Sequence, residues 1–181
     1  MAKPATPRKT SAKGAASDET FELRSLQEAH LANPRYQPKT IVTTCPHCFN
    51  TLLNEYPDFG GKFNVVHHSA FLSDLVRQGK LRPAHRVDAR VAFHDSCYLG
   101  RSNEVYEPPR ETLRAIPGLT VLEPAETRDR GMCCGAGGAQ MFKEEEHART
   151  GTNGERVNEK RTDQLLATKP DMVASACPFC Q

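Results

Sequence analysis

The sequence predicts an α/β fold, with a mostly parallel sheet and helices flanking it. Short runs rich in apolar and β-branched residues alternate with segments whose apolar residues recur at helical spacing. Cys45, Cys97 and Cys177 each lie just past the end of one of the strand-like runs. Because ligands bind parallel sheets beyond the carboxyl ends of the strands, we expect these cysteines at the ligand-binding edge.

The first half of the chain is expected to hold three helices and three strands. The helices are expected at residues 21–31, 49–56 and 71–76, and the strands at residues 40–44, 63–66 and 87–94. Proline and glycine mark the predicted ends, because proline interrupts a helix and glycine favours turns. Asn33-Pro34 ends the first helix, Pro57 with Gly60-Gly61 ends the second, and Gly79 ends the third.

The second half continues this alternation and adds an adjacent pair of cysteines. Helices are expected at residues 110–116 and 155–168, and strands at residues 119–122 and 172–176. Gly131 to Gly138 is expected to form a tight glycine-rich loop that holds Cys133 and Cys134. Leu165 and Leu166 are among the residues expected to face inward from the last helix.

Bulk composition narrows the class of function. The 181 residues carry a formal net charge of +2 and a sequence pI of about 8.2, which indicates neither a nucleic-acid nor an acidic partner. No apolar run approaches the roughly 18 residues of a membrane span, and the chain begins with no secretory segment. We therefore expect a cytoplasmic protein whose seven cysteines bind metal or do redox work.

Five cysteines form the pattern C-x35-CC-x42-C-x2-C: Cys97, Cys133, Cys134, Cys177 and Cys180. Adjacent cysteines suit one disulfide or one metal ion poorly, because neighbouring side chains diverge. An iron–sulfur cluster offers several iron atoms, so two neighbouring thiolates can each bind one. The pattern therefore predicts a metal site and favours an iron–sulfur cluster. The alternative is structural zinc held by four thiolates.

Cys45 and Cys48 form a second Cys-x-x-Cys pair, and two thiolates cannot complete a cluster. The pair is open to three interpretations: a redox-active couple, ligands that await partners from another segment, or vestigial residues. A fourth interpretation joins the pair with Cys177 and Cys180 in a zinc site of four cysteines.

Four residues near the strand ends are candidates to support the metal site. His94 and Asp95 precede Cys97, where they could hydrogen-bond a cluster or relay protons, or simply be satisfied by the backbone. His67 and His68 follow a strand and could face the same crevice, or be solvated or satisfied in the core.

The glycine-rich loop and a nearby arginine each have two interpretations. Gly135, Gly137 and Gly138 would let the backbone approach a cluster and donate N–H groups to its sulfur atoms, which tunes the reduction potential. The same glycines also fit a simple tight turn. The charge of Arg101 could offset an anionic cluster, or it could be a plain surface cation.

The chain contains an internal repeat that implies two lobes. Residues 41–48 and 173–180 are both a strand followed by Cys-Pro-x-Cys, at an offset of 132 residues (177 minus 45). No cysteine precedes Cys45 to complete the first copy, and only Gln181 follows the second. We expect a disordered leader at residues 1–20, the remnant of a first cysteine-rich lobe at 21–86, and a second lobe at 87–181 that lacks its C-terminal tail.

Three phrases resemble the cysteine-rich CCG domain family, over about residues 35 to 180. They are TTCPHCFN from Thr43, FHDSCYLGR from Phe93 and CCGAGG from Cys133. That domain occurs in the cysteine-rich subunit of heterodisulfide reductase and in the iron–sulfur subunits of glycolate oxidase, anaerobic glycerol-3-phosphate dehydrogenase and lactate-utilisation complexes. The chain is similar to the C-terminal portion of such proteins, and it departs from them in lacking the upstream cysteines of the first lobe.

The resemblance implies a [4Fe-4S]-type cluster, non-cubane in the heterodisulfide reductases, with Cys97, Cys133, Cys134, Cys177 and Cys180 as ligands. It implies an oxidoreductase subunit that relays electrons between a flavoprotein or ferredoxin module and a disulfide, quinone or further carrier. Such a subunit would work at the cytoplasmic face of a membrane through its partners. The alternatives are a zinc-stabilised structural or interaction module and an inactive fragment of a larger iron–sulfur oxidoreductase. The sequence identifies no catalytic acid or base.

Overall fold

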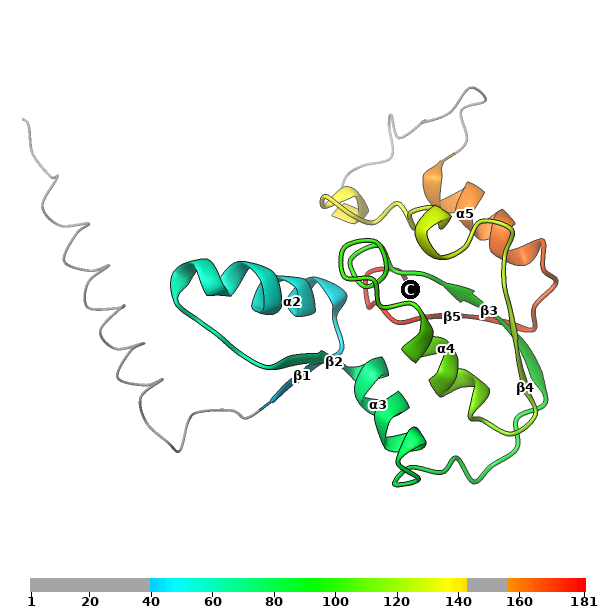
Figure 1. Cartoon of the computed structure of the whole chain (residues 1–181). Helices are drawn as coiled ribbons and strands as arrows, with labels where there is room; N and C mark the ends of the chain where they lie inside the picture. The colour runs from blue at the N-terminus through cyan, green and yellow to red at the C-terminus, as the bar shows by residue number, and fades with distance from the viewer. Residues whose placement is uncertain (1–39, 143–155) are drawn as a thin grey trace, which may run out of the picture. The chain divides into compact units, whose positions relative to one another are not determined.

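Two small parallel sheets position the cysteines. The computed structural model describes residues 40–142 and 156–181, which belong to one compact unit (Figure 1). The first sheet pairs β1 (Ile41–Thr43) with β2 (Val65–His67). The second sheet places β3 (Ala89–His94) between β4 (Leu119–Leu122) and β5 (Met172–Ser175). All three pairings are parallel, which confirms the predicted α/β class.

Helices supply the crossovers that parallel strands require. The described helices are α2 (Pro46–Asn50), α3 (His68–Arg77), α4 (Glu107–Arg114) and α5 (Val157–Leu166). Three-residue 3₁₀ turns lie at Arg128–Arg130 and Gln140–Phe142. The leader expected at residues 1–20 and the helix expected at 21–31 lie outside the described residues.

The second predicted helix begins earlier and ends later than its sequence indicates. It starts at Pro46, because the first turn of a helix tolerates proline, whose missing N–H would have no partner there. Pro57 does not end it. The chain continues through a π-helical turn, Thr51–Glu55, into a 3₁₀ turn, Tyr56–Phe59, that begins next to Pro57. Gly60 then ends the run with a φ of 86°, which glycine adopts without strain.

Strand β3 forms the centre of the larger sheet. Val91, Ala92 and Phe93 are only 1%, 0% and 3% exposed, as expected for a parallel strand that is covered on both faces. Helix α5 covers one part of this strand and turns Leu165 inward. The prediction that Leu166 also faces inward is wrong, because Leu166 is 52% exposed. Adjacent helical residues point about 100° apart, and the buried neighbour of Leu165 is Arg161, one turn earlier.

One core joins the two sheets. It contains Phe49 from α2, Val65 from β2, Phe93 from β3, Leu99 from the loop after β3 and Ala176 from the end of β5. These residues flank the cysteine motifs directly: Leu99 lies two residues after Cys97, and Ala176 precedes Cys177. Packing of this core therefore fixes the strand-end loops relative to one another.

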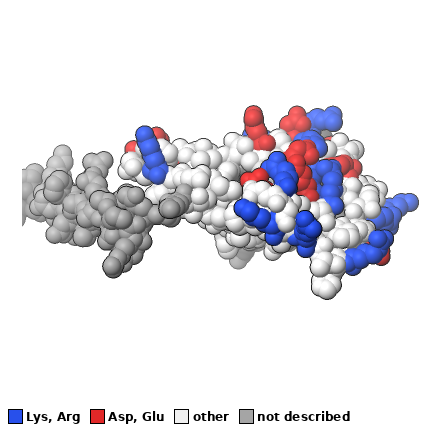
Figure 2. Space-filling model, turned by 60° about the horizontal axis from the view of Figure 1, so that its bottom comes forward, with Lys and Arg blue, Asp and Glu red and all other residues white. Residues whose placement is uncertain are grey.

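Charge on the surface is mixed. On the face seen in Figure 2, basic and acidic side chains are interspersed. Two of the exposed ion pairs are Arg86–Asp88 and Arg90–Asp171, whose side chains are half-exposed or more. Such pairs contribute little to stability, about 0–1 kcal/mol each. Buried groups, rather than these exposed pairs, are therefore expected to hold the fold together.

Replacing Leu99 with alanine should lower the free energy of unfolding by about 2–5 kcal/mol, because the removed atoms leave a cavity in the shared core. The matched control is Leu166→Ala, the same chemical change at an exposed position, which should cost less than about 1 kcal/mol. Urea unfolding under reducing conditions measures both. Equal losses in the two variants would contradict the assignment of Leu99 to the core.

Candidate metal centre

Three loops bring cysteines to one edge of the larger sheet. β3 and β5 are parallel neighbours with His94 opposite Ser175, so the segments that follow them leave from the same edge. The first segment holds Cys97 and the second holds Cys177 and Cys180. The loop after the Arg128–Arg130 turn supplies the adjacent pair, Cys133 and Cys134. All seven cysteines are free thiols.

The five predicted ligands lie within electrostatic reach of one another. The sulfur atoms of Cys134 and Cys180 lie within 4.8 Å of each other, and Cys180 also interacts with Cys177. Cys97 interacts electrostatically with Cys133, Cys134 and Cys177. Cys177 is buried and the other four are half-buried. The structure therefore brings together the complete C-x35-CC-x42-C-x2-C set.

Hydrogen bonding among the five cysteines determines which of their thiols are ionised. Hydrogen bonding to Cys180, helped by His94, lowers the pKa of Cys134 to about 4, and hydrogen bonding to Cys180 also lowers the pKa of Cys177 to about 6. The same two partners raise the pKa of Cys180, which keeps its proton. Burial and then the neighbouring thiolates raise the pKa of Cys97. These thiols resist full ionisation unless a cation replaces their protons, as metal binding does.

The spacing of the ligand atoms tests which metal group fits. Tetrahedral zinc with Zn–S distances of about 2.3 Å holds its sulfur atoms about 3.8 Å apart. Among the described residues, one group of three or more potential ligands gathers its atoms within 4.8 Å, and it contains His94, Cys134 and Cys180. A single ion at that point would reach two of the five cysteines. A cluster with several irons, which spreads its ligands more widely, fits the set better.

Backbone N–H groups of the cysteine-pair loop interact with the ligand sulfur atoms. Gly135 N–H donates to Cys133 Sγ at 3.3 Å. Its φ of 84° and the 3.2 Å between a Cβ built there and the backbone N of Asn158 both favour glycine. Gly138 has a φ of 61°, which is typical of a turn, and a Cβ built at Gly137 would meet nothing within 4 Å.

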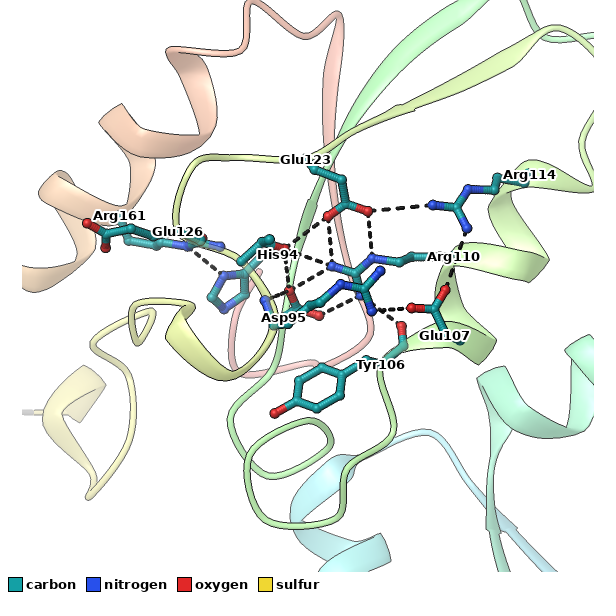
Figure 3. Close-up of polar contacts among 11 residues, drawn as sticks. His94, Asp95, Tyr106, Glu107, Arg110, Arg114, Glu123, Glu126 and Arg161 are labelled. Carbon is teal, nitrogen blue, oxygen red and sulfur yellow. Dashed lines mark hydrogen bonds and ion pairs between the residues drawn. The ribbon is translucent and has the colours of Figure 1, made fainter.

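A buried ion pair anchors the loop that leads to the cysteine pair (Figure 3). Arg110 is fully buried and donates to both oxygens of Asp95 at 2.8 Å, and it also donates to Glu123. Thr127 Oγ1 and the backbone N–H of Arg128 donate to Asp95 as well. Burial alone would raise the pKa of Asp95, but these hydrogen bonds outweigh it and lower the pKa.

This network defines what Asp95 does in the structure. As an ionised carboxylate it only accepts hydrogen bonds, so it cannot donate one to a cluster sulfur. It instead joins the end of β3 to helix α4 and to the 123–128 segment. Arg101 has a similar effect, since its NH2 group donates to the carbonyl oxygens of Gly131 at 2.7 Å and Asp129 at 3.3 Å.

His94 is held by a residue that sequence reasoning missed. Arg161 Nε donates to His94 Nδ1 at 3.0 Å, and both residues are buried (Figure 3). The only signal in the sequence was position: Arg161 lies four residues before Leu165, on the same helix face. An arginine on a core-facing stripe is a candidate for a buried role.

The first Cys-Pro-x-Cys motif lies beside the second. The ring of His47, between Cys45 and Cys48, is 4.4 Å from the ring of Tyr98 and 5.1 Å from that of Phe179. Cys45 Sγ lies 3.8 Å from His47 Nδ1, and a hydrogen bond to Cys45 raises the pKa of Cys48. Sequence reasoning gave His47 no role.

The four cysteines of the two Cys-Pro-x-Cys motifs do not form one group of closely spaced ligand atoms among the described residues. All four cysteines are described, and the group with ligand atoms within 4.8 Å contains neither Cys45 nor Cys48. A ring contact between His47 and Phe179 joins the two motifs.

His67 and His68 are not part of the group whose ligand atoms lie within 4.8 Å of one another. His67 ends β2, is 1% exposed, and caps helix α3 by accepting from the backbone N of Ser69; its Nδ1 also lies 2.8 Å from Ser69 Oγ. Burial, helped by the charge of His68, lowers the pKa of His67 to about 4. His67 Nε2 and His68 Nδ1 have no hydrogen-bond partner among the described residues. One predicted alternative was a histidine whose hydrogen bonds are satisfied within the core. The contacts of His67 Nδ1 with Ser69 agree with that alternative.

Residues 91–181, half of the chain, match the model of the CCG cysteine-rich domain family, and the chain belongs to that family. The predicted resemblance is confirmed. None of the described helices combines the length and the apolar character that crossing a membrane requires.

Curated relatives carry iron–sulfur and oxidoreductase names. The chain is 53% identical over 161 residues to a probable iron–sulfur-binding oxidoreductase, FadF, of Bacillus subtilis, covering 88% of this chain and 22% of the relative. It is 44% identical over 146 residues to the EtfAB:quinone oxidoreductase of Syntrophomonas wolfei, covering 80% of this chain and 20% of the relative. It is 35% identical over 144 residues to one subunit of the dihydromethanophenazine:CoB–CoM heterodisulfide reductase of Methanosarcina acetivorans, covering 78% of this chain and 34% of the relative.

These relatives confirm that the chain is related to iron–sulfur oxidoreductases, and they support the predicted electron-transfer function. The chain spans about a fifth of the length of the first two relatives. No solved structure matches the chain.

Replacing Arg110 with glutamine should lower the free energy of unfolding by about 3–5 kcal/mol, because it leaves the Asp95 carboxylate buried without its counter-charge. Arg114→Gln on the same helix is the matched control. Its side chain is 49% exposed and lies 3.7 Å from Glu123, so its loss should cost about 1 kcal/mol or less. Chemical denaturation compares the two, and a cost for Arg110→Gln no larger than that for Arg114→Gln would refute the anchoring role.

Proposed function

We propose that this chain binds a [4Fe-4S]-type cluster and relays electrons as part of a larger oxidoreductase. The observation that carries the proposal is the convergence of five free cysteines, from three loops, at the ligand edge of a parallel sheet. The proposed ligands are Cys97, Cys133, Cys134, Cys177 and Cys180. Five thiolates exceed the four that a cubane cluster commonly uses, which leaves room for a non-cubane form.

The chain's own residues would hold the cluster and set its surroundings. A bound cluster supplies one-electron transfer at a potential that depends on nearby charge, hydrogen bonds and solvent exposure. Leu99 and Ala176 exclude water beside Cys97 and Cys177, because both belong to the buried core. Gly135 donates to Cys133 Sγ, and hydrogen bonds to ligand sulfur stabilise negative charge there.

Two of the predicted supporting residues act on the cysteines indirectly, through the segment that leads to the cysteine pair. Asp95 and Arg101 both hold the segment that runs from residue 123 to Gly131, shortly before the cysteine pair. Their proposed role is to fix the separation between Cys97 and Cys133.

We further propose that Cys45 and Cys48 contribute to a second metal site, completed by residues outside this chain. Two observations support this. The pair is not gathered with the other cysteines into a single-ion site, and this chain spans about a fifth of its first relatives. The ring contacts of His47 would hold such a site next to the first.

The proposed partners are a flavoprotein or ferredoxin-type donor and a quinone, disulfide or further carrier as acceptor. The names of the relatives support this range, since they include a quinone oxidoreductase and a part of a heterodisulfide reductase. Partners of this kind would place the chain at the cytoplasmic face of a membrane. A zinc-stabilised interaction module is the second candidate, favoured only by the close approach of His94, Cys134 and Cys180.

Anaerobic reconstitution tests the proposal directly. The parent chain should take up about four irons and four sulfides, and the Cys133→Ser/Cys134→Ser double variant should lose them, because two adjacent ligands are gone. The control is Met141→Ser/Phe142→Ser, two exposed neighbours shortly after the same loop, which should keep the parent's content. Iron, acid-labile sulfide and zinc are counted per chain.

One zinc per chain with no sulfide would instead support the structural module. A folded chain that takes up neither metal would refute both candidates.

A further inference from the structure

Arg161 is a buried cation whose hydrogen-bond partners are all neutral. It is 2% exposed. Its Nε donates to His94 Nδ1 at 3.0 Å, and its NH1 donates to the backbone oxygen of Glu126 at 2.8 Å and to Gln164 Oε1 at 3.0 Å. Its NH2 group is buried without a hydrogen-bond partner among the described residues. The guanidinium therefore has spare donor capacity and makes no direct pair with a described carboxylate.

Arg110, the other fully buried arginine, shows the usual arrangement. It pairs with Asp95 and Glu123, which raise its pKa despite its burial. Burial instead lowers the pKa of Arg161, and the more distant carboxylates of Asp95 and Glu126 offset only part of that effect. A buried charge without a close partner is strongly unfavourable. Such a residue points to an anion that completes its surroundings.

The contact between Arg161 and His94 also fixes the state of the histidine. A guanidinium only donates hydrogen bonds, so His94 Nδ1 must be the acceptor and carry no proton. The neutral ring then carries its proton on Nε2. The ligand nitrogen of His94 lies within 4.8 Å of the sulfur atoms of Cys134 and Cys180. The Nε2–H group is therefore available to a cysteine sulfur.

We propose that Arg161 is the buried counter-charge of the cluster, and that it holds His94 as an Nε2–H donor to Cys134 sulfur. This rests on the proposed function, because the anion in question is the thiolate-ligated cluster. His94 is then a hydrogen-bond donor to the site and not one of its metal ligands. Both residues are positioning residues.

The arrangement has a definite consequence for redox behaviour. A cluster that gains one electron becomes more negative, with the electron supplied by the reductant and no proton transferred to either residue. A fixed positive charge and a hydrogen-bond donor stabilise the more negative form. Arg161 and His94 should therefore raise the reduction potential of the cluster.

The test is an anaerobic redox titration of reconstituted protein, after iron and sulfide have been counted. Arg161→Gln should make the cluster about tenfold harder to reduce, which is a fall of about 59 mV for a one-electron couple. Lys160→Gln is the matched control, since it removes the same charge from an exposed position one residue earlier on α5. It should leave the potential within about twofold of the parent, or about 18 mV. Equal potentials in the two variants would overturn the proposal.

Two further measurements keep the test decisive if Arg161→Gln fails to fold. Arg161→Lys keeps the charge, so the ease of reducing the cluster should stay within about threefold of that of the parent. A tenfold fall would overturn the counter-charge role.

Nitrogen-15 NMR of the cluster-free parent should find the His94 proton on Nε2, and a proton on Nδ1 would overturn the assigned tautomer. A parent that binds no cluster would refute the proposed function itself, whereas normal cluster uptake with unchanged potentials would refute only this inference.

Discussion

The bidentate pair between Arg110 and Asp95 is the interaction on which the geometry of the metal centre depends. It joins three elements at a single buried point: the end of β3, helix α4 and the segment from Glu123 to Arg128. The first element leads to Cys97 and the third leads to the cysteine pair. Burying two charges is costly, but paired and fully hydrogen-bonded they define a single arrangement of the loops. The positions of three of the five cysteines follow from that arrangement.

The thiol group does not ionise fully in the absence of a cation, because Cys180 keeps its proton. Cys134, Cys177 and Cys180 interact through shared protons. Each further thiol that loses its proton is repelled by the thiolates already present. Binding of a cationic group would displace the remaining protons, which makes the affinity of such a site depend on pH.

The sequence predicted the features that depend on local pattern. Alternating strand-like and helical runs indicated the α/β class, and the placement of Cys97 and Cys177 after strands indicated where they would gather. Cys45 also follows a strand, but that strand, β1, belongs to the other sheet. What it could not predict depends on partners far apart in the chain. His94 and Arg161 are 67 residues apart in the sequence. No short-range pattern of apolar and polar residues indicates that two such distant side chains will form a hydrogen bond. Leu166 was misplaced because a polar residue, Arg161, occupies the inward stripe that an apolar residue usually fills.

The core shared by the two sheets has a consequence for how this molecule can be divided. The family match begins at residue 91, yet Phe49 and Val65 pack in the same core as Phe93 and Leu99. A piece cut at the family boundary would leave the apolar surface that those two residues cover open to water, at about 25 cal/mol for each Å² exposed. The family match therefore begins later in the sequence than the segment that is needed to bury the core. The smallest piece that buries its own core includes the first Cys-Pro-x-Cys motif.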